Sequence, residues 1–524
     1  MFDPTHGLFH LPDKAERERM RAGAPLNPLK IIALLTAREW IYVACGLYSW
    51  IMDSYDFFSV SMSIDNLVVT FYPNVTNPSE QKDKAQEISY SIMLTLLLRT
   101  LGAVTVGLLA DKWGRRWILS ANLLCVAALS LGTAFCTSYG AFLGVRCVFG
   151  IFMGGIWGLS TATALEDINP VARGLFSGIL QQGYAMGYLV AAAVNLGWAT
   201  HLKGGEGDWR VLFYLGAGLS LGAAIFRAIL PEGATFRALR QQNKLKRQAS
   251  TSKKTFFKGL VNMLSSYGGI CIYGILLMTG FNFLSHSSQD LYPTMVKDAK
   301  MMSSTQSSQL TIIMNCGAIV GGIIAGYVSQ YTGRRIAMIM FIIFAGAIIP
   351  LWILPDTFGG LAAGAFLIQF GVQGAWGVIP AYLTELSPPQ FRATYPGLAY
   401  QLGNMASSAS STIETRGGKN IRIDDPKHPG QTIPDTATVS AILMGCVTAY
   451  LLIVIMFGVE PKQKGSYDVE EPTAKFEAGP SVPENSDEEA QWSTSDEKYD
   501  CCKESPMKPV RDVQTCDDIS DKKL

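Results

Sequence analysis

Apolar runs of about 20 residues recur along the chain, and each run is bounded by charged residues or by Gly and Pro. A run of this length matches an α-helix that crosses the hydrocarbon core of a bilayer. The pattern predicts twelve such helices, at residues 40–62, 88–110, 117–137, 139–164, 174–199, 209–230, 262–291, 306–329, 336–354, 358–382, 393–413 and 436–458. The predicted fold class is therefore an all-α integral membrane protein.

The composition supports this fold class. Hydrophobic residues make up 49% of the 524 residues and charged residues 16%, whereas soluble proteins average about 25% charged residues. The Cys residues show neither the spacing of metal ligands nor a disulfide framework, and no nucleophile motif or nucleotide-binding loop is present. We expect a protein that is not an enzyme and that binds no metal, cofactor or nucleic acid.

Basic residues predict how the helices are oriented. They gather at residues 111–116 (DKWGRR), in the segment 231–261 and at residues 332–335 (TGRR), which all lie on one side of the membrane if both termini are cytoplasmic. The first 39 residues are polar, so no amino-terminal signal peptide is expected. The outer side then carries Asn74 in an Asn-Val-Thr sequon, a candidate for glycosylation.

An internal repeat divides the chain into two halves. Gly107 and Gly326 lie 219 residues apart, and the same offset pairs Gly114 with Gly333, Arg115 with Arg334, Arg116 with Arg335, Trp157 with Trp376, Glu166 with Glu385 and Arg173 with Arg392. We predict two homologous six-helix bundles, at residues 40–230 and 262–458, that rock about a central cavity. The other predicted segments are cytoplasmic: an amino-terminal segment (1–39), a central loop (231–261) and a disordered tail (459–524).

The seventh predicted helix carries a polar face. Four residues follow the spacing i, i+4, i+7 and i+8, which places them on one side of a helix: Asn282, His286, Gln289 and Asp290. Polar groups are costly in lipid, so this face is expected to look into protein or water and to bind a substrate or a proton. In the repeat, residues 55–59 match residues 281–285, so Asp56 is expected to face Asn282 across the pseudo-symmetry axis.

Residues 107–116, GLLADKWGRR, resemble the signature of the major facilitator superfamily, and residues 326–335 are a degenerate copy. The resemblance implies the fold of that family, in which such aspartate and arginine residues form cytoplasmic contacts that balance outward-open and inward-open states. It assigns gating roles to Asp111, Arg115, Arg116, Arg334 and Arg335, and to two expected charge pairs, Glu166 with Arg173 and Glu385 with Arg392. From the residues alone, we expect Asp111 to cap the next helical turn while the arginines stay in water.

The stretch from Asn282 to Thr294 resembles a narrower signature, N-x-x-[S/T]-H-x-[S/T]-Q-D-x-x-x-T, of fungal lactate and carboxylate permeases. Every specified position matches. The resemblance covers residues 40–458 and implies a carboxylate:proton symporter of a fungal plasma membrane, in the branch that also contains sialate:proton symporters.

Arg99 is the first candidate for binding a carboxylate. It lies in the middle of the predicted helix 88–110, too deep to reach water, and a guanidinium can hold a carboxylate through two parallel hydrogen bonds. The alternative is a structural ion pair with Asp53 or Asp56. Because these two carboxylates lie one helical turn apart, either is a candidate proton carrier or counter-ion to Arg99.

His286 is the candidate proton switch, because an ordinary histidine has a pKa of about 6.5, and Asp290 one turn away would orient the ring. Neutral donors to the substrate are expected from Asn282, Gln289, Gln181 or Gln182, Gln401 and Asn404; Gln401 matches an eleventh-helix glutamine of the permease family. Arg146 resembles part of a proton-symporter motif but equally fits helix packing. Arg227 is expected to snorkel to water, and the aromatic segments GGIWGLS and QGAWGVIP are interpreted as packing.

Together these features predict a secondary transporter that imports a short-chain monocarboxylate, such as lactate, pyruvate or acetate, with one proton. A proton cancels the charge of the anion, which would otherwise enter against about 2.3 kcal/mol per 100 mV. Two alternatives stay open: a di- or tricarboxylate:proton symporter for acids such as malate or succinate, and a non-transporting carboxylate sensor. The acidic tail offers Lys475 and Lys498 to an endocytic ubiquitylation machinery, or is simply solvated.

Overall fold

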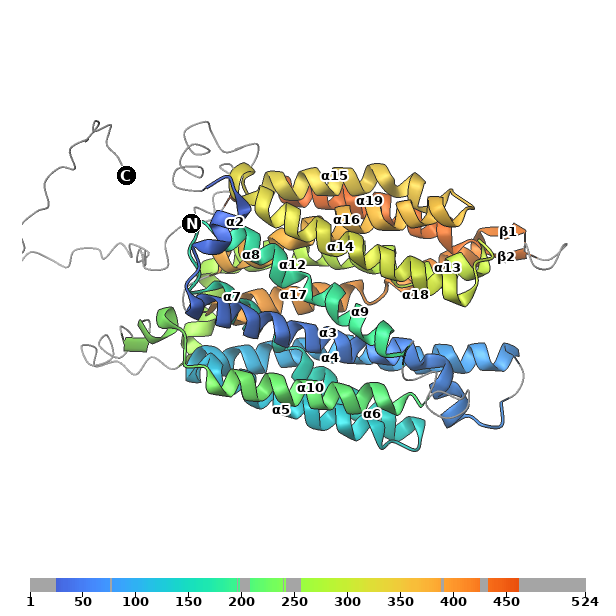
Figure 1. Ribbon diagram of the computed structural model, residues 1–524, viewed down its shortest axis with the longest axis horizontal. Coiled ribbons are helices and arrows are strands. Elements are labelled where there is room, and N and C mark those ends of the chain that lie inside the picture. The colour runs from blue at the N-terminus through green and yellow to red at the C-terminus, as the bar shows by residue number, and fades with distance from the viewer. Residues whose placement is uncertain are drawn as a thin grey trace, which may run out of the picture. The chain divides into compact units, whose positions relative to one another are not determined.

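The structure is a computed structural model that describes residues 25–75, 78–195, 197, 208–238, 240–241, 256–387, 391–424 and 432–460. Most of these residues are helical, and the long helices run side by side (Figure 1). The first half forms α2 (Pro28–Ala33), α3 (Ala37–Phe71), α4 (Pro78–Trp113), α5 (Arg115–Ala134), α6 (Tyr139–Met153), α7 (Ile156–Leu165), α8 (Arg173–Gln181), α9 (Gly183–Val194) and α10 (Arg210–Ile229).

The second half forms α12 (Phe256–Gln289), α13 (Tyr292–Asp298), α14 (Ser304–Thr332), α15 (Arg334–Ile353), α16 (Phe358–Leu386), α17 (Thr394–Ser407), α18 (Ser410–Asn420) and α19 (Thr436–Met456). Strands β1 (Arg422–Asp424) and β2 (Thr432–Pro434) pair antiparallel between α18 and α19, where the apolar pattern predicted no element. Within the halves, α5 packs on α10 and α4 on α6, while α14 and α15 both pack on α16.

Nine helical stretches within the described residues are long and apolar enough to cross a membrane. Three other predicted spans do not meet this measure, and the polar groups and helix breaks they contain explain why. The predicted helix 40–62 is the longer α3, which carries Asp53 and Asp56 near its centre, while the predicted helices 174–199 and 393–413 are each broken in two. As described below, these three helices contribute side chains to the pocket.

Glycine makes two equivalent turns possible at one end of the molecule. Gly114 joins α4 to α5 with a φ of +112°, and Gly333 joins α14 to α15 with a φ of +94°. Side chains other than hydrogen are strained in this region of φ. We call the end that carries these two turns and the arginines after them the basic end, and the other the opposite end.

Part of the predicted amino-terminal segment is folded against the basic end. Ile31 of α2 is fully buried, in a cluster that contains Leu175 of the first half and Tyr331 of the second. The hydroxyl of Tyr331 donates to the backbone oxygen of Pro25 at 2.7 Å. Residues 25–35 therefore contact both halves.

Glycine also allows α8 and α14 to approach each other closely across the two halves. A Cβ atom at Gly178 would lie 2.3 Å from the backbone oxygen of Gly322, and one at Gly326 would lie 2.6 Å from that of Gly174. No side chain fits at this distance, so the two backbones are in direct contact.

We expect Gly178→Ala to lower the melting temperature, because the methyl group forces the helices apart at a cost of about 1–3 kcal/mol. Gly218→Ala is the matched control, since a Cβ there meets nothing within 4 Å and alanine favours a helix. Thermal unfolding of the detergent-purified protein measures both variants. Equal melting temperatures would contradict the close contact.

Candidate functional site

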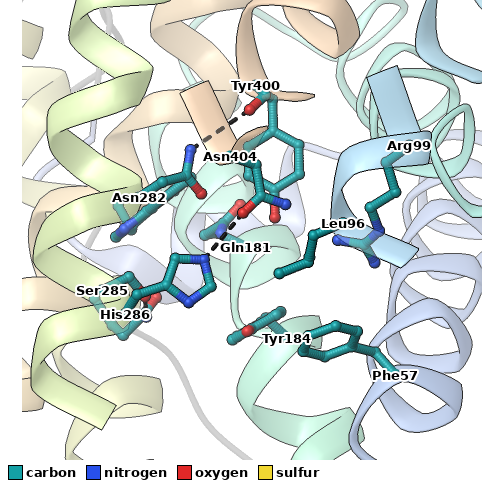
Figure 2. Close-up of a pocket in the computed structure, with 12 residues that line it drawn as sticks. Phe57, Leu96, Arg99, Gln181, Tyr184, Asn282, Ser285, His286, Tyr400 and Asn404 are labelled. Carbon is teal, nitrogen blue, oxygen red and sulfur yellow. Dashed lines mark hydrogen bonds between the residues drawn. The ribbon is translucent and has the colours of Figure 1, made fainter. Parts of the chain in front are cut away.

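A pocket lies between the two halves of the chain (Figure 2). Five of its lining residues come from the first half and seven from the second: Phe57, Leu96, Arg99, Gln181 and Tyr184, and Asn282, Ser285, His286, Gln373, Trp376, Tyr400 and Asn404. Figure 2 shows Arg99 on one side of the pocket and Asn282 and His286 on the other. The pocket therefore combines polar groups from both halves.

Two walls of the pocket are broken helices. α8 ends at Gln181 and α9 begins at Gly183; the backbone oxygen of Gln181 accepts from Trp50 Nε1 at 3.3 Å and its side-chain oxygen from Trp157 Nε1 at 3.3 Å. α17 ends at Ser407, one turn beyond Asn404, and α18 follows it. Broken helices at a binding site free backbone polar groups and let the two pieces move separately.

The imidazole of His286 is held from both sides. Its Nδ1 lies 3.0 Å from Asp290 Oδ2 and its Nε2 lies 2.9 Å from Asn404 Oδ1. Both partners are acceptors, so an imidazolium with a proton on each nitrogen satisfies both contacts at once. His286 is buried, whereas 38% of the Asp290 side chain is exposed. Asp290 thus links a buried proton-binding ring to the molecular surface.

A chain of amides leads from His286 to the first half. Asn404 Nδ2 donates to Gln401 Oε1 at 3.5 Å, and Gln401 Nε2 donates to the backbone oxygen of Gly154 at 3.5 Å. The hydroxyl of Thr100 donates to the backbone oxygen of Gln401 at 3.2 Å. The ring of His286 is therefore connected by hydrogen bonds to the contact between the halves.

Arg99 lines the pocket and also forms an ion pair. Its Nη2 lies 3.3 Å from Asp53 Oδ2, and its guanidinium carbon lies 5.2 Å from the centroid of the Phe57 ring. Arg99 and Asp53 are both buried. The predicted structural partner is thus Asp53 rather than Asp56, and a carboxylate that binds Arg99 must share it with Asp53.

Asp56 and Arg146 do not line the pocket. Asp56 accepts from the hydroxyls of Ser130 at 2.8 Å and Ser220 at 3.0 Å. Arg146 donates to the backbone oxygen of Asp56 at 3.4 Å, and its guanidinium carbon lies 3.9 Å from the centroid of the Phe149 ring. The expectation that Asp56 faces Asn282 is wrong, because hydroxyls of α5 and α10 hold Asp56 inside the first half.

The polar face of α12 enters the pocket only in part. Asn282 lines it, and its amide donates to the backbone oxygen of Met278 at 2.8 Å. Gln289 is the last residue of α12 and does not line the pocket; its Nε2 donates to Ser285 Oγ at 2.5 Å. Ser285 is the lining residue, so Gln289 is placed to orient that hydroxyl rather than to touch a ligand.

Aromatic residues form a larger part of the lining than the sequence interpretation assigned to them. Tyr184, Trp376 and Tyr400 all line the pocket, and the ring of Tyr400 stacks on Trp157 with centroids 4.8 Å apart. The segment QGAWGVIP, which was interpreted as packing, therefore also contacts the cavity, through Gln373 and Trp376. The pairing of Trp157 with Trp376 in the repeat was the available signal, because the rings of both residues contact Tyr400.

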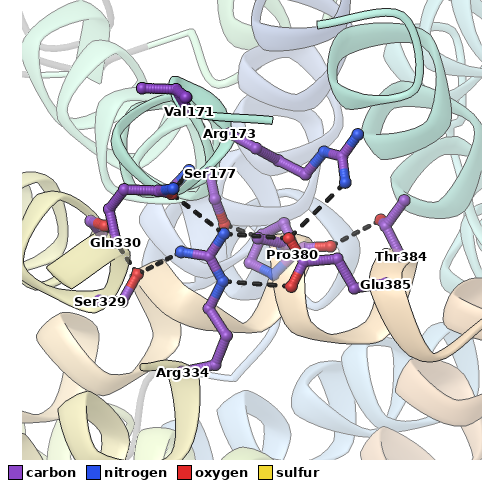
Figure 3. A network of polar contacts seen from close by, with 12 residues as sticks. Val171, Arg173, Ser177, Ser329, Gln330, Arg334, Pro380, Thr384 and Glu385 are labelled. Atoms are coloured by element: carbon purple, nitrogen blue, oxygen red, sulfur yellow. Dashed lines mark hydrogen bonds and ion pairs between the residues drawn. The ribbon is translucent and has the colours of Figure 1, made fainter. Parts of the chain in front are cut away.

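A separate polar cluster joins the halves at the basic end (Figure 3). Glu385 of α16 accepts from Arg334 Nη2 at 3.0 Å, and Arg173 Nη1 of α8 lies 3.7 Å from the same oxygen. Arg173 belongs to the first half and Glu385 to the second. The expected pair of Glu385 with Arg392 is therefore wrong.

The repeat-related cluster has the same exchanged pairing. Arg392 Nη1 of the second half lies 3.5 Å from Glu166 Oε1 of the first, and Arg115 also pairs with Glu166. Glu166 therefore pairs with Arg115 of its own half and with Arg392 of the second half, and not with Arg173 as expected. Partial burial lowers the pKa of Arg392, but the guanidinium stays charged because its ordinary pKa is so high.

Helix caps reinforce these ion pairs. Asp111 accepts from the backbone N–H groups of Ala393 at 3.3 Å and Thr394 at 3.0 Å, where α17 of the other half begins. In the repeat-related position, Gln330 Oε1 accepts from the backbone N–H of Gly174 at 3.3 Å. The expectation that Asp111 caps the next helical turn is wrong, because it caps a helix of the opposite half.

Two glutamates that the sequence interpretation missed cap the helices after the glycine turns. Glu232 accepts from the backbone N–H groups of Arg115 and Arg116, at 3.2 and 3.1 Å, and Glu460 accepts from the equivalent groups of Arg334 and Arg335. Burial raises the pKa of Glu460, and the bonds from these N–H groups lower it.

The arginines of the basic end are not in water as expected. Arg115, Arg334 and Arg335 are all buried, and Arg116 Nε donates to the backbone oxygen of Ala228 at 2.9 Å. Arg227, expected to snorkel, is also buried, 3.7 Å from Glu232. Carboxylates and backbone carbonyls replace water around these guanidinium groups.

Some predicted sites lie at or beyond the limits of the described residues. Asn74 is exposed, but Thr76 of its sequon lies outside the described part, as do Lys475 and Lys498 of the tail. Glycosylation and ubiquitylation stay predictions.

Residues 54–411 match the sequence model of the Major Facilitator Superfamily. The chain belongs to this superfamily. It is therefore a multi-pass membrane transporter, and the predicted fold class is confirmed.

The chain is 32% identical over 447 residues to the "Carboxylic acid transporter protein homolog" of Saccharomyces cerevisiae. This alignment covers 83% of the chain and 70% of the yeast protein. Its fold is similar to that of the proton:xylose symporter XylE, with a TM-score of 0.62 at 16% identity over 82% of this chain and 97% of the other. The human organic anion transporter MFSD10 gives a TM-score of 0.58 at 16% identity, over 80% and 99%. The two structural similarities show the fold alone.

In this major facilitator chain, the pocket is shared by both halves, and ion pairs, helix caps and glycine contacts join the halves at the basic end. The structure is therefore a conformation closed at the basic end. The polar cluster at the basic end and the pocket are separate, and the residues predicted to act in gating, other than Arg116 and Arg335, lie within contacts that cross between the halves or support them.

Proposed function

We propose that this protein is a proton-coupled symporter that imports a short-chain monocarboxylate, such as lactate, pyruvate or acetate, across the plasma membrane. One observation carries the proposal: a pocket between the halves is lined by the guanidinium of Arg99 on one side and the imidazole of His286 on the other. The name of the yeast relative, a carboxylic acid transporter homolog, supports this class of substrate. The basic loops favour a cytoplasmic basic end with both termini inside.

The contacts suggest how each group acts. The carboxylate binds the guanidinium of Arg99 and competes with Asp53, while the amides of Asn282, Asn404 and Gln181 donate to its oxygens. His286 binds the proton. The chain of amides through Gln401 transmits this change in the protonation of His286 to the contact between the halves. With anion and proton both bound, the cargo is neutral, which removes the cost of moving charge across the membrane.

The lining favours a monocarboxylate over a di- or tricarboxylate. Within the described residues, Arg99 and His286 are the cationic or potentially cationic groups of the pocket lining. Arg146, the second arginine that could have met a second carboxylate, is held by Asp56 and Phe149 outside the lining. A second carboxylate would therefore lie in the pocket without a positive partner.

The test is uptake of labelled lactate by cells that lack their own carboxylate carriers, with the pH of a weakly buffered medium recorded. We expect uptake with alkalinisation of the medium, and competition by pyruvate but not by malate or succinate. Alkalinisation with malate or succinate and not with lactate would assign the chain to dicarboxylates. Silence with every acid, in protein shown to reach the surface, would contradict the transport proposal and favour a sensor.

The substitution His286→Gln tests the coupling. Glutamine keeps polar contacts to Asp290 and Asn404 but cannot carry a charge, so we expect uptake to fall at least about tenfold, the effect of losing one charge-assisted hydrogen bond. The remaining uptake should alkalinise the medium less per molecule of lactate. Initial rates and proton movement are measured together, and an unchanged ratio would return His286 to a structural role. Gln306→Ala is the control, because Gln306 belongs to the capping box of α14 and does not line the pocket.

A further inference from the structure

Glu414 is a buried carboxyl group that the proposed mechanism does not use. It lies on α18, toward the opposite end of the molecule (Figure 1), and its side chain is fully buried. The sequence interpretation missed it because the predicted helix ended at residue 413, one position earlier. A buried carboxylate is costly unless a cation or several donors compensate it.

The surroundings of Glu414 contain few such compensating groups. Its Oε1 accepts from the hydroxyl of Ser410 at 3.1 Å, and Ser440 of α19 also lies within its reach. Within the described residues, no Lys or Arg pairs with it. Arg416, two positions along the same helix, is exposed, and residues two apart do not face each other on a helix.

The titratable neighbours of Glu414 come from the last turn of α12 and from the residue that follows this helix. His286 and Asp290 both act on it electrostatically, and Asp290 Oδ2 accepts from the hydroxyl of Ser411, which is adjacent to Ser410 in the chain. α19 itself carries no charged residue. The residue that caps its start, Asp435, accepts a hydrogen bond from the backbone N–H of Thr438 in the same helix. β2 carries no charged residue.

Counting charges shows which state of Glu414 this arrangement tolerates. A protonated His286 and an ionised Asp290 form a neutral pair, and the acceptors on both ring nitrogens favour that state. An ionised Glu414 would then add one buried negative charge without a partner of its own. A neutral Glu414 leaves the whole cluster uncharged, and its hydrogen bond from Ser410 is kept at the carbonyl oxygen.

We propose that Glu414 is a second proton-binding group of this transporter, protonated in the conformation closed at the basic end. When Glu414 ionises, its O–H bond breaks and the proton leaves through Asp290 to water at the opposite end. The negative charge left behind is then opposed by the imidazolium of His286. The role in transport rests on the proposed function, whereas the protonation itself does not.

Infrared difference spectroscopy of the full chain in liposomes, without substrate, tests the protonation directly. We expect a carbonyl stretching band of a protonated carboxylic acid at neutral pH that is lost in Glu414→Gln. Ser410→Ala should shift this band to higher wavenumber, because it removes the hydrogen bond to the carbonyl oxygen. Asp356→Asn, an exposed acid paired with Lys300, is the matched control and should leave the band intact.

The transport readout is the dependence of lactate uptake on external pH. Glutamine imitates the protonated acid permanently, so Glu414→Gln should keep uptake at acid pH with a pH dependence shallower by up to about one proton. Glu414→Asp, which can still titrate, should restore the wild-type slope and serves if Glu414→Gln does not fold. A purely structural Glu414 would give the same slope in all three proteins and would overturn the inference.

The two proposals fail in different ways. Lactate:proton symport without a band that depends on Glu414 would overturn only the inference about Glu414. A band that is lost in Glu414→Gln, in a chain that transports no carboxylate, would support the protonation and contradict only the proposed function.

Discussion

Replacing Arg99 with lysine is expected to reduce carboxylate uptake strongly while the protein still reaches the membrane. Lysine keeps the positive charge, so the ion pair with Asp53 and the folding of the first half are preserved. It lacks the planar fork that binds a carboxylate through two bonds. Loss of one hydrogen bond to a charged group costs about 1.5–3 kcal/mol. We therefore expect the rate of uptake to fall about 10- to 100-fold.

The measurement is the initial rate of labelled lactate uptake, divided by the amount of protein at the surface. Arg38→Lys is the control, because Arg38 is exposed near the start of α3. Its uptake should equal that of the wild type. Normal uptake with unchanged apparent affinity in Arg99→Lys would remove Arg99 from the binding site and leave it as the structural partner of Asp53.

Replacing Glu385 with glutamine is expected to open the basic end. Glu385 is shared by Arg173 of the first half and Arg334 of the second, so the change leaves two buried guanidinium groups without their carboxylate. Removing one partner of a buried pair costs about 3–5 kcal/mol, which corresponds to a loss of about 100-fold or more in the population of the closed conformation. The rate of uptake should fall as the population of the closed conformation falls, because the transporter no longer returns efficiently to the conformation closed at the basic end.

A cysteine at position 177 reports the opening. Ser177 of α8 is buried, and its hydroxyl donates to the backbone oxygen of Gly377 in the second half at 2.8 Å. We expect Ser177→Cys to react with a polar thiol reagent, supplied from the side of the basic end, much faster in the Glu385→Gln background. The exposed Cys316 and Cys446 are replaced by serine throughout.

The comparison needs a control of the same chemistry. Asp356→Asn also removes one carboxylate, but from an exposed pair with Lys300, and should leave the labelling rate unchanged. Equal labelling in the Glu385→Gln and wild-type backgrounds would show that the ion pairs across the halves do not hold the basic end closed.

The ion pairs at the basic end show what a repeat can and cannot predict. The offset of 219 residues identified Glu166, Arg173, Glu385 and Arg392 as equivalent charged residues. It could not say which acid meets which base, because sequence proximity favoured pairs within one half. The observed pairs are exchanged between the halves, since the close approach of glycines on α8 and α14 brings the two halves together at the basic end.

For the pocket, too, the sequence predicted some residues correctly and others not. The spacing of Asn282 and His286 placed both on one helix face, and both line the pocket. The end of α12 at Gln289 and the hydroxyls that hold Asp56 inside the first half depend on neighbours far away in the sequence. The helical spacing and the repeat predicted Gln289 and Asp56 in the pocket. These distant neighbours are the reason why neither residue lines it.

The sequence by itself determined the membrane class, most helices, the repeat, and the polar residues from which the pocket and the gate are built. These follow from local quantities: the length of apolar runs, the helical period, and the cost of charge in lipid. Only the tertiary structure decided the pairing of Arg99 with Asp53, the exchanged ion pairs, the cap of α17 by Asp111 and the burial of Glu414. The physical reason is that the partner of a buried charge is set by which helices pack together, and that packing is decided by contacts between residues far apart in the chain.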